Sequence, residues 1–374
     1  MKDIKFVNHA CFSFTVNNFG VLVDPWFAGA IFNQSWRLVS DGGKVPENLK
    51  YIFITHEHPD HLHWPTLKKL ASQNITVCLA KRQNPNVVDN LKRMGYKVLE
   101  LDNQRYNLDG LFVEFFGVGH DNAIVFQSDG LTVLNQNDCY LSDSQAFAIK
   151  AKYPVIDLWW MQFSLAGYYG NFDDVDAMNK AQQQHKDWFS TYKAIFDPKI
   201  SIPFASYVYF SRKENQELNR YRVRLEDLLE DNTDTQVLFK GDTVLFEDYD
   251  DRNQLNVTKW EELFESTSTF DTPSTSLGTL QENFVNFCNK YQPQGSLEFE
   301  LSDKTQDCIL DFTTKRVTLG GVSNPIAKVA AFDLSEMFKN PWGADTMNIT
   351  SCFHVYNLET WRSLLGTIDS LYTR

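Results

Sequence analysis

Short apolar stretches separated by turn-forming residues fill the first quarter of the chain, and this pattern predicts a β-rich region. Asn17 and Asn18 mark one of the turns, because asparagine tolerates left-handed backbone conformations. A further apolar stretch, residues 51–55, is predicted to be a buried strand that leads straight into the polar motif THEHPDH. The other predicted strands of this region cover residues 4–7, 11–16 and 20–24.

Helical and strand patterns alternate in the next part of the chain. Pro65 opens a predicted helix directly after the motif, and Gly95 ends a second one. Asp129 and Gly130 are a strong signal for a hairpin between two strands. The predicted strands cover 75–80, 98–101, 112–116, 123–127 and 131–135, and a β-α-β unit covers 155–160, 174–196 and 200–203. We therefore expect an α/β fold with helices packed outside the sheets.

The composition changes at residues 266–276, STSTFDTPSTS. A polar segment rich in serine and threonine and containing proline is typical of a linker. We therefore expect a first domain over residues 1–265, a linker over 266–278 and a small α+β domain over 279–374. The last of these contains no motif with obvious chemistry.

Charge and cysteine usage narrow the class of protein. The net charge of −13 argues against general nucleic-acid binding, which needs a basic face. The six cysteines are dispersed without a C-x-x-C pair, which indicates reduced thiols. The N-terminal residues lack the apolar core of a signal peptide, and no apolar run is long enough to span a membrane. We expect a soluble, cytoplasmic protein.

The motif after the strand at 51–55 concentrates metal-binding side chains. His56, His58, Asp60 and His61 fall within six positions, and half of the eight histidines lie between residues 56 and 63. Imidazole and carboxylate groups suit zinc, iron or manganese. Because side chains alternate in direction along an extended turn, His56 and His58 are predicted to bind one ion, and Asp60 and His61 a second. The alternative is a polar surface loop.

The motif H-x-H-x-D-H after a strand resembles the metallo-β-lactamase superfamily. This resemblance implies an αββα sandwich with the catalytic site in the first domain. It also implies three further roles: His120 in GVGHDN as third ligand of the first metal, Asp138 in LNQNDC as bridging carboxylate, and Asp24 in VLVDPW as a residue that orients a ligand histidine. Each of the three has an ordinary alternative as a turn or core residue.

The chain departs from the superfamily at one position. The resemblance implies a last histidine for the second metal within a P-x-H segment, but residues 202–207 read IPFASY, with Ala205 in its place. His9, His63 and Tyr207 are the candidates to complete or support this site. His9 lies in an NHA segment that resembles the G-H-[AS] segment of lactonase-like and phospholipase-like members. Its alternative is a packed core histidine.

Several segments resemble the catalytic region of CMP-N-acetylneuraminate hydroxylases and their bacterial relatives. They read DPWFAGAIFNQSW, ITHEHPDHLHWPTL and SIPFASYVYFS, and the last shares the departure from P-x-H. Those hydroxylases carry a Rieske domain. Cys352 and His354 form C-x-H here without a matching C-x-x-H, so we expect no Rieske cluster.

Three functions are compatible with the motif. The first is a metal-dependent hydrolase that uses a metal-activated water, with Asp60 and Asp138 as catalytic carboxylates, on an ester, lactone, amide or phosphoester bond. The alternative is an iron-dependent oxygenase on the same ligands, and the third is a non-catalytic binding protein. The expected cofactor is one or two divalent transition-metal ions, zinc first and iron or manganese next. The expected partner is a small molecule, with a sugar- or nucleotide-linked compound as one option.

Polar residues in predicted loops near strand ends are the candidate substrate contacts. They are Arg37, Tyr207 and Arg212, followed by Lys81, Arg82 and Tyr209. His185 lies in a polar helical segment, QQQHKDW, and is expected to face solvent.

Overall fold

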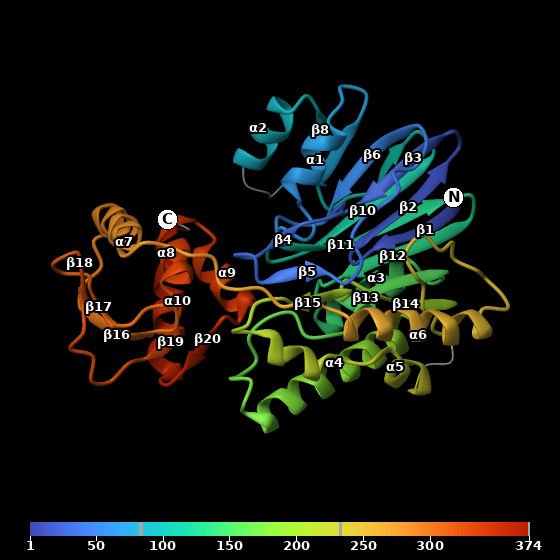
Figure 1. Ribbon diagram of the computed structural model, residues 1–374. Coiled ribbons are helices and arrows are strands. Elements are labelled where there is room, and N and C mark those ends of the chain that lie inside the picture. The colour runs from blue at the N-terminus through green and yellow to red at the C-terminus, as the bar shows by residue number, and fades with distance from the viewer. Residues whose placement is uncertain (82–84, 232–233, 373–374) are drawn as a thin grey trace.

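Two six-stranded sheets face each other in the larger part of the computed structural model, which describes residues 1–81, 85–231 and 234–372 (Figure 1). The first sheet has the order β1-β2-β3-β6-β7-β8: β1 (Lys2–Asn8), β2 (Cys11–Val16), β3 (Phe19–Val23), β6 (Leu49–Ile54), β7 (Thr76–Ala80) and β8 (Lys97–Leu101). The second has the order β14-β13-β12-β11-β10-β9: β14 (Ile200–Phe204), β13 (Leu158–Gln162), β12 (Leu131–Asn137), β11 (Asp121–Ser128), β10 (Leu111–Val118) and β9 (Tyr106–Leu108). Each sheet is antiparallel at one end and parallel at the other.

A layer of aromatic side chains joins the two sheets. Phe12 of β2 stacks on Trp160 of β13 with ring centroids 4.8 Å apart. Phe53 of β6 meets Phe126 of β11 edge to face at 5.0 Å. All four side chains are fully buried. Because large aromatic side chains dominate the burial free energy of a core, this layer fixes how the sheets pack.

Helices cover the outer face of each sheet. On the first sheet, α1 (Trp64–Leu70) and α2 (Pro85–Arg93) bury Leu67 and Leu91 in one cluster with Ile52 of β6. On the second sheet lie α3 (Asp143–Lys152) and α4 (Val175–Phe196), whose Phe189 packs on Trp159 at 4.9 Å. The predicted αββα sandwich is therefore confirmed.

The local signals for turns are also confirmed. Asp129 and Gly130 have φ values of 52° and 78° and join β11 to β12, where Ser128 pairs with Leu131. Positive φ at both central residues is the geometry that a two-residue hairpin requires. Gly95 follows α2 with φ 96°, as expected of a glycine that ends a helix.

Smaller elements complete the larger part of the molecule. A three-stranded sheet of order β15-β5-β4 was not predicted, because its strands span only two or three residues each. Its strands are β15 (Val208–Phe210), β5 (Trp36–Leu38) and β4 (Ala30–Ile31), and the accompanying helices are η1 (Gln216–Tyr221), α5 (Leu225–Asp231) and α6 (Asp250–Glu265).

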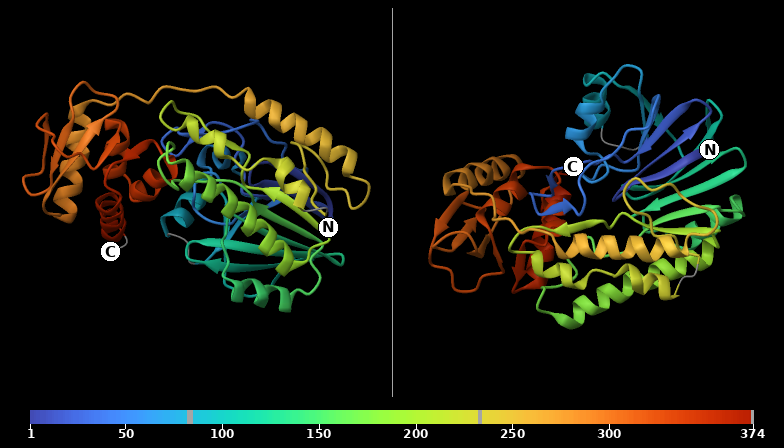
Figure 2. Two further views of the ribbon diagram at one scale, coloured as in Figure 1. Left: turned by 90° about the horizontal axis from the view of Figure 1, so that it is seen from below. Right: turned by 45° about the vertical axis from the view of Figure 1, so that its right-hand side comes forward.

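The C-terminal elements enclose a hydrophobic core of their own, formed by side chains between Leu280 and Ile368. A five-stranded sheet has the order β18-β17-β16-β19-β20. An extended segment after α6 leads to these elements (Figure 2), and the predicted domain boundaries remain a prediction. The elements are α7 (Leu277–Tyr291), β16 (Ser296–Leu301), β17 (Cys308–Asp311), β18 (Arg316–Leu319), β19 (Ala327–Val329), α8 (Ala331–Lys339), α9 (Gly343–Thr350), β20 (Phe353–Val355) and α10 (Leu358–Tyr372).

A buried ion pair connects the two parts. The guanidinium of Arg212 donates from both terminal nitrogens to the carboxylate of Asp333 on α8, each at 2.8 Å. Asn215 donates to the carbonyl of Thr350 at 2.8 Å. Among the described helices, none combines the length and the apolar character that a membrane crossing needs.

Candidate metal centre

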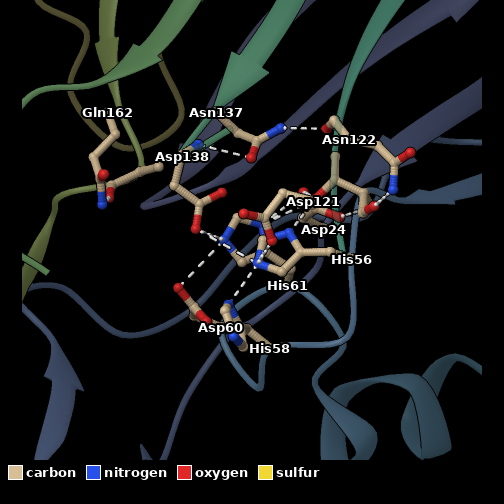
Figure 3. A network of polar contacts seen from close by, with 12 residues as sticks. Asp24, His56, His58, Asp60, His61, Asp121, Asn122, Asn137, Asp138 and Gln162 are labelled. Carbon is tan, nitrogen blue, oxygen red and sulfur yellow. Dashed lines mark hydrogen bonds and ion pairs between the residues drawn. The ribbon is translucent and has the colours of Figure 1, made fainter. Parts of the chain in front are cut away.

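The polar motif lies at one edge of the sandwich, between the end of β6 and the start of α1. Three other segments bring side chains to the same edge. His9 lies in the turn between β1 and β2, Asp121 begins β11, and Asp138 directly follows β12. Figure 3 shows the side chains of the motif, Asp121 and Asp138 converging on one small region.

The first group of donors consists of His56, His58 and Asp138, whose ligand atoms all lie within 4.8 Å of one another. His56 Nε2 is 2.8 Å from His58 Nδ1 and 3.5 Å from Asp138 Oδ2. Asp121 Oδ1 approaches the same nitrogen of His56 at 3.8 Å. Two imidazoles and one carboxylate therefore converge on one position, and a second carboxylate lies close to His56.

The second group consists of His9, Asp60 and His61, which are all buried. Asp60 Oδ2 is 3.2 Å from His9 Nε2 and 3.3 Å from His61 Nε2. Asp138 Oδ2, a member of the first group, is also 3.3 Å from His61 Nε2. Asp138 therefore reaches both groups, as a bridging carboxylate would.

Asp24 supports the second group from behind. It accepts hydrogen bonds from the backbone N–H of Thr55 at 2.9 Å and from the Thr55 hydroxyl at 2.7 Å. Its Oδ2 lies 2.8 Å from His61 Nδ1. A carboxylate that accepts the outer N–H of an imidazole fixes its tautomer and orientation, so this contact turns His61 Nε2 toward the donors.

Two asparagines that the sequence did not single out hold the segments together. Asn122 donates to the carbonyl of Thr55 at 2.7 Å, and Asn137 donates to the carbonyl of Asn122 at 3.0 Å. The Asn137 side chain accepts the backbone N–H of Asp138 at 2.7 Å. These bonds connect the ends of β6, β11 and β12, and only adjacency to the predicted ligands could have indicated them.

The charged groups of the cluster shift one another's pKa values. Burial alone would raise the pKa of Asp60 and Asp138, but the neighbouring imidazoles hold both pKa values below the usual one. Burial opposes the charged form of His61, yet the surrounding carboxylates raise its pKa well above normal. Burial and the neighbouring imidazole lower the pKa of His58 to about 4.

Buried donor atoms without partners identify what the cluster can hold. Asp60 Oδ1 and Asp138 Oδ1 have no hydrogen-bond partner among the described residues, and His61 Nε2 makes only ion-pair contacts with the two carboxylates at 3.3 Å. Leaving such atoms buried and unsatisfied costs free energy. Carboxylate and imidazole donors are ligands for divalent transition metals, so metal ions fit this set of residues.

The structure does not bring His120 into either group. β10 and β11 pair with Val118 opposite Asp121, so Gly119 and His120 form the turn between them. His120 is exposed, and its ring contacts that of Trp342 at 5.5 Å. The carboxylate of Asp121, one position later, lies beside His56 in its place.

Of the three candidates for the second site, only His9 lies in a donor group. His9 lies in the second group, next to Ala205. His63 directly precedes α1 as its N-cap residue, and its Nδ1 lies 2.8 Å from the hydroxyl of Thr66. Tyr207 is buried, with its hydroxyl donating to the carbonyl of Pro203 at 3.1 Å.

The candidate substrate contacts have partners within the chain, and a role in substrate binding stays a prediction. Tyr207 packs on Trp260 at 4.4 Å in the main core. Arg212 is buried in its ion pair with Asp333, and the guanidinium of Arg37 lies 4.0 Å from the centre of the Phe270 ring. Distant partners therefore occupy all three side chains. Lys81 pairs with Asp102, Tyr209 is buried, and Arg82 lies outside the described residues.

The predicted exposure of His185 is wrong. The side chain is buried on α4. Its Nδ1 lies 3.1 Å from the hydroxyl of Tyr140, and its Nε2 lies 3.0 Å from the hydroxyl of Tyr169. Both ring nitrogens therefore have a hydroxyl partner, which compensates for removal of the imidazole from water.

Comparison with known proteins shows that the cluster lies within a segment that matches a known family model. Residues 3–152 match the family model described as a beta-lactamase superfamily domain. The cytidine monophosphate-N-acetylneuraminic acid hydroxylase of Pongo pygmaeus is 25% identical over 269 residues, which cover 62% of this chain and 44% of the relative. The Xenopus laevis enzyme is 26% identical over 237 residues, 55% of this chain and 38% of the relative. The chain thus spans less than half the length of these two relatives.

Solved structures that match the chain do so at lower sequence identity. CmlA, a diiron beta-hydroxylase from Streptomyces venezuelae, has a TM-score of 0.41 and 15% identity, covering 72% of this chain and 52% of its own. An isothiocyanate hydrolase from Delia radicum gut bacteria has a TM-score of 0.44 and 15% identity, covering 65% of this chain and 98% of its own.

Proposed function

We propose that this chain, which contains a metallo-β-lactamase-type domain, is a dinuclear iron enzyme that hydroxylates a small organic molecule with dioxygen. The observation that carries the proposal is the composition of the two donor groups. His56, His58 and Asp138 form one set of two imidazoles and one carboxylate, and His9, His61 and Asp60 form another. This combination is typical of non-haem iron oxygenases, in which the bound iron activates dioxygen.

Asp121 adds a further carboxylate near the first donor group. The resemblance to the superfamily predicted an imidazole from His120 there, whereas Asp121 Oδ1 lies 3.8 Å from His56 Nε2. A cluster that combines imidazoles with several carboxylates is compatible with iron as well as with zinc. The chain's similarity to hydroxylases over 62% of its length supports a hydroxylation rather than a hydrolysis.

The protein's own residues supply orientation and a dry environment. Asp24 fixes the ring of His61, and Asn137 fixes the backbone of Asp138. His9, His56, Asp60 and His61 are each at most 5% exposed. Exclusion of water strengthens each electrostatic contact inside the cluster and protects reactive species from side reactions.

Metal analysis joined to an oxygen assay tests the proposal. The full chain, purified from cells supplied with both iron and zinc, is expected to contain two irons, one for each donor group. Reduction of this protein under air should then start oxygen uptake that a chelator abolishes. Zinc as the bound metal, without oxygen uptake, would contradict the proposal.

A zinc-dependent hydrolase is the second candidate. The observation that favours it is Asp138, whose Oδ2 lies 3.5 Å from His56 and 3.3 Å from His61. A carboxylate shared between two ions is compatible with hydrolytic two-metal sites, and two histidines with one carboxylate also bind catalytic zinc. Turnover of an ester, lactone, amide or phosphoester by the zinc form would favour this candidate.

A further inference from the structure

A cavity of about 460 Å³ lies between the motif loop and the C-terminal helix α8. We infer that this cavity, which lies next to the donor groups without reaching them, binds a neutral or cationic molecule with an apolar body, rather than a nucleotide. The volume of the cavity is within the range of small-molecule pockets.

The cavity adjoins the donor groups through the motif loop. Pro59, which separates His58 from Asp60 in the chain, forms part of its wall. Phe32 lines the cavity as well, and its ring meets that of His58 edge to face at 6.2 Å. A molecule in the cavity is therefore separated from the first donor group by one aromatic ring and one turn of backbone.

A strained segment forms another wall. Phe32, Asn33 and Gln34 have φ values of 45°, 56° and 62°, which is rare for three successive residues other than glycine. Such strain persists only where surrounding contacts impose it, and it is concentrated at ligand sites. Here Asn33 donates to Asp333 at 3.4 Å, and the hydroxyl of Ser211 donates to the carbonyl of Gln34 at 3.2 Å.

The C-terminal part forms one wall of the cavity, which stays open to solvent. Phe332 and Glu336 of α8 line it, on either side of Asp333 in the chain. The buried pair of Asp333 with Arg212 holds α8 against the strained segment. The binding site is therefore complete only when the C-terminal elements are docked.

The lining residues indicate the class of ligand. Trp64, Phe332 and Phe32 offer aromatic surface, and Asn33 adds an amide. Glu336 is the one carboxylate, and no lysine or arginine is present among the described residues that line the cavity. Because phosphate recognition relies on cationic side chains, this lining disfavours a nucleotide.

Two further side chains, one beside the cavity and one in its lining, do not change this conclusion. Lys339 lies 3.0 Å from the carboxylate of Glu336, but its side chain is 54% exposed, so water screens the pair. His63 also lines the cavity, and its Nδ1 is engaged with the hydroxyl of Thr66.

Ligand-observed NMR on the full chain as purified tests the inference with four probes: tryptamine, tryptophol, indole-3-acetate and CMP. The three indoles differ mainly in charge. Tryptamine and tryptophol should bind, and tryptamine should bind about fivefold more tightly than indole-3-acetate, as expected for one partly exposed charge contact. The inference would be overturned if indole-3-acetate or CMP bound as tightly as tryptamine or more tightly. It would also be overturned if neither tryptamine nor tryptophol bound.

Matched variants assign the binding to this cavity. Glu336→Gln should remove the preference for tryptamine, whereas Glu359→Gln, at an exposed position on α10, should keep it. Phe332→Leu, which preserves an apolar side chain, should weaken all binding. Unchanged binding in both Glu336→Gln and Phe332→Leu would mean that the probes bind outside this cavity, and this result would refute the proposed binding site. Because binding is measured instead of turnover, failure here is distinguishable from failure of the proposed iron chemistry.

Discussion

The backbone N–H of Ala205 donates a hydrogen bond to the carbonyl oxygen of His9 at 3.0 Å. The two residues come from the end of β14 and from the turn between β1 and β2, and both have positive φ values, 46° and 29°. The superfamily resemblance implied a ligand histidine at position 205. The structure has an alanine there, directly beside a histidine from another segment that belongs to the second donor group.

His9→Ala is therefore expected to empty the second donor group while leaving the first loaded. The reason is that His9 supplies one of the two imidazoles near Asp60. Metal content, measured by elemental analysis after gel filtration, should fall from two ions per chain to one.

A second-site change separates ligand loss from general damage. Ala205→His in the His9→Ala background should restore the second ion, because a left-handed backbone is more tolerable for histidine than for most larger residues. Ala205→His alone should leave the metal content at two ions per chain, because His9 is already present. Two ions in His9→Ala would refute the assignment of His9.

Substitutions of Asp121 and His120 should have different effects on metal binding by the first donor group. Asp121→Asn should weaken metal binding by at least about tenfold, because even the loss of an outer partner of a ligand typically costs that much. His120→Gln should retain the affinity of the unchanged protein, since its ring contacts Trp342 instead. Competition with a chromogenic chelator measures both. The reverse result would restore His120 as the ligand.

Removal of the charge of Asp333 should destabilise the protein strongly. Asp333→Asn leaves the buried guanidinium of Arg212 without its bidentate partner, and breaking such a pair costs about 3–5 kcal/mol. Urea unfolding, followed by fluorescence, measures the change. Asp271→Asn is the matched control, because Asp271 pairs with Lys213 at 83% side-chain exposure and should change stability by less than about 1 kcal/mol. Equal effects of the two substitutions would contradict the structural role of the buried pair.

His185 should make stability depend on pH. Burial lowers the pKa of its imidazole from 6.5 to about 4 in the folded chain. Because the pKa of this imidazole is lower in the folded chain than in the unfolded chain, its contribution to the free energy of unfolding is fully present above pH 6.5. This contribution, on the order of 3 kcal/mol, is lost as the pH falls toward 4. Unfolding of His185→Gln between pH 7 and pH 4 should show a smaller loss than the unchanged chain. An identical loss in both proteins would contradict this role.

Local signals predicted much of the fold. Asp129 and Gly130 specify their hairpin through backbone geometry that few other residues adopt, and the motif follows a strand whose apolar run is continuous. His56, His58, Asp60 and His61 lie close together because short spacing along one loop limits where these side chains can lie, and their role as metal ligands stays a prediction.

The remaining site residues depend on register and on distant partners. A shift of one residue in the β10–β11 turn determines whether His120 or Asp121 approaches His56, and composition does not fix that register. Arg212 resembled a substrate contact because its partner, Asp333, lies 121 residues away in the chain. No local pattern connects two such positions.

Anomalous X-ray diffraction from crystals of the iron-supplied protein, recorded on both sides of the iron edge and of the zinc edge, tests the central claim most directly. The account predicts two iron peaks within about 4 Å of each other, one beside His56, His58 and Asp138 and one beside His9, Asp60 and His61. A single peak, a peak at the zinc edge alone, or peaks remote from these side chains would contradict it.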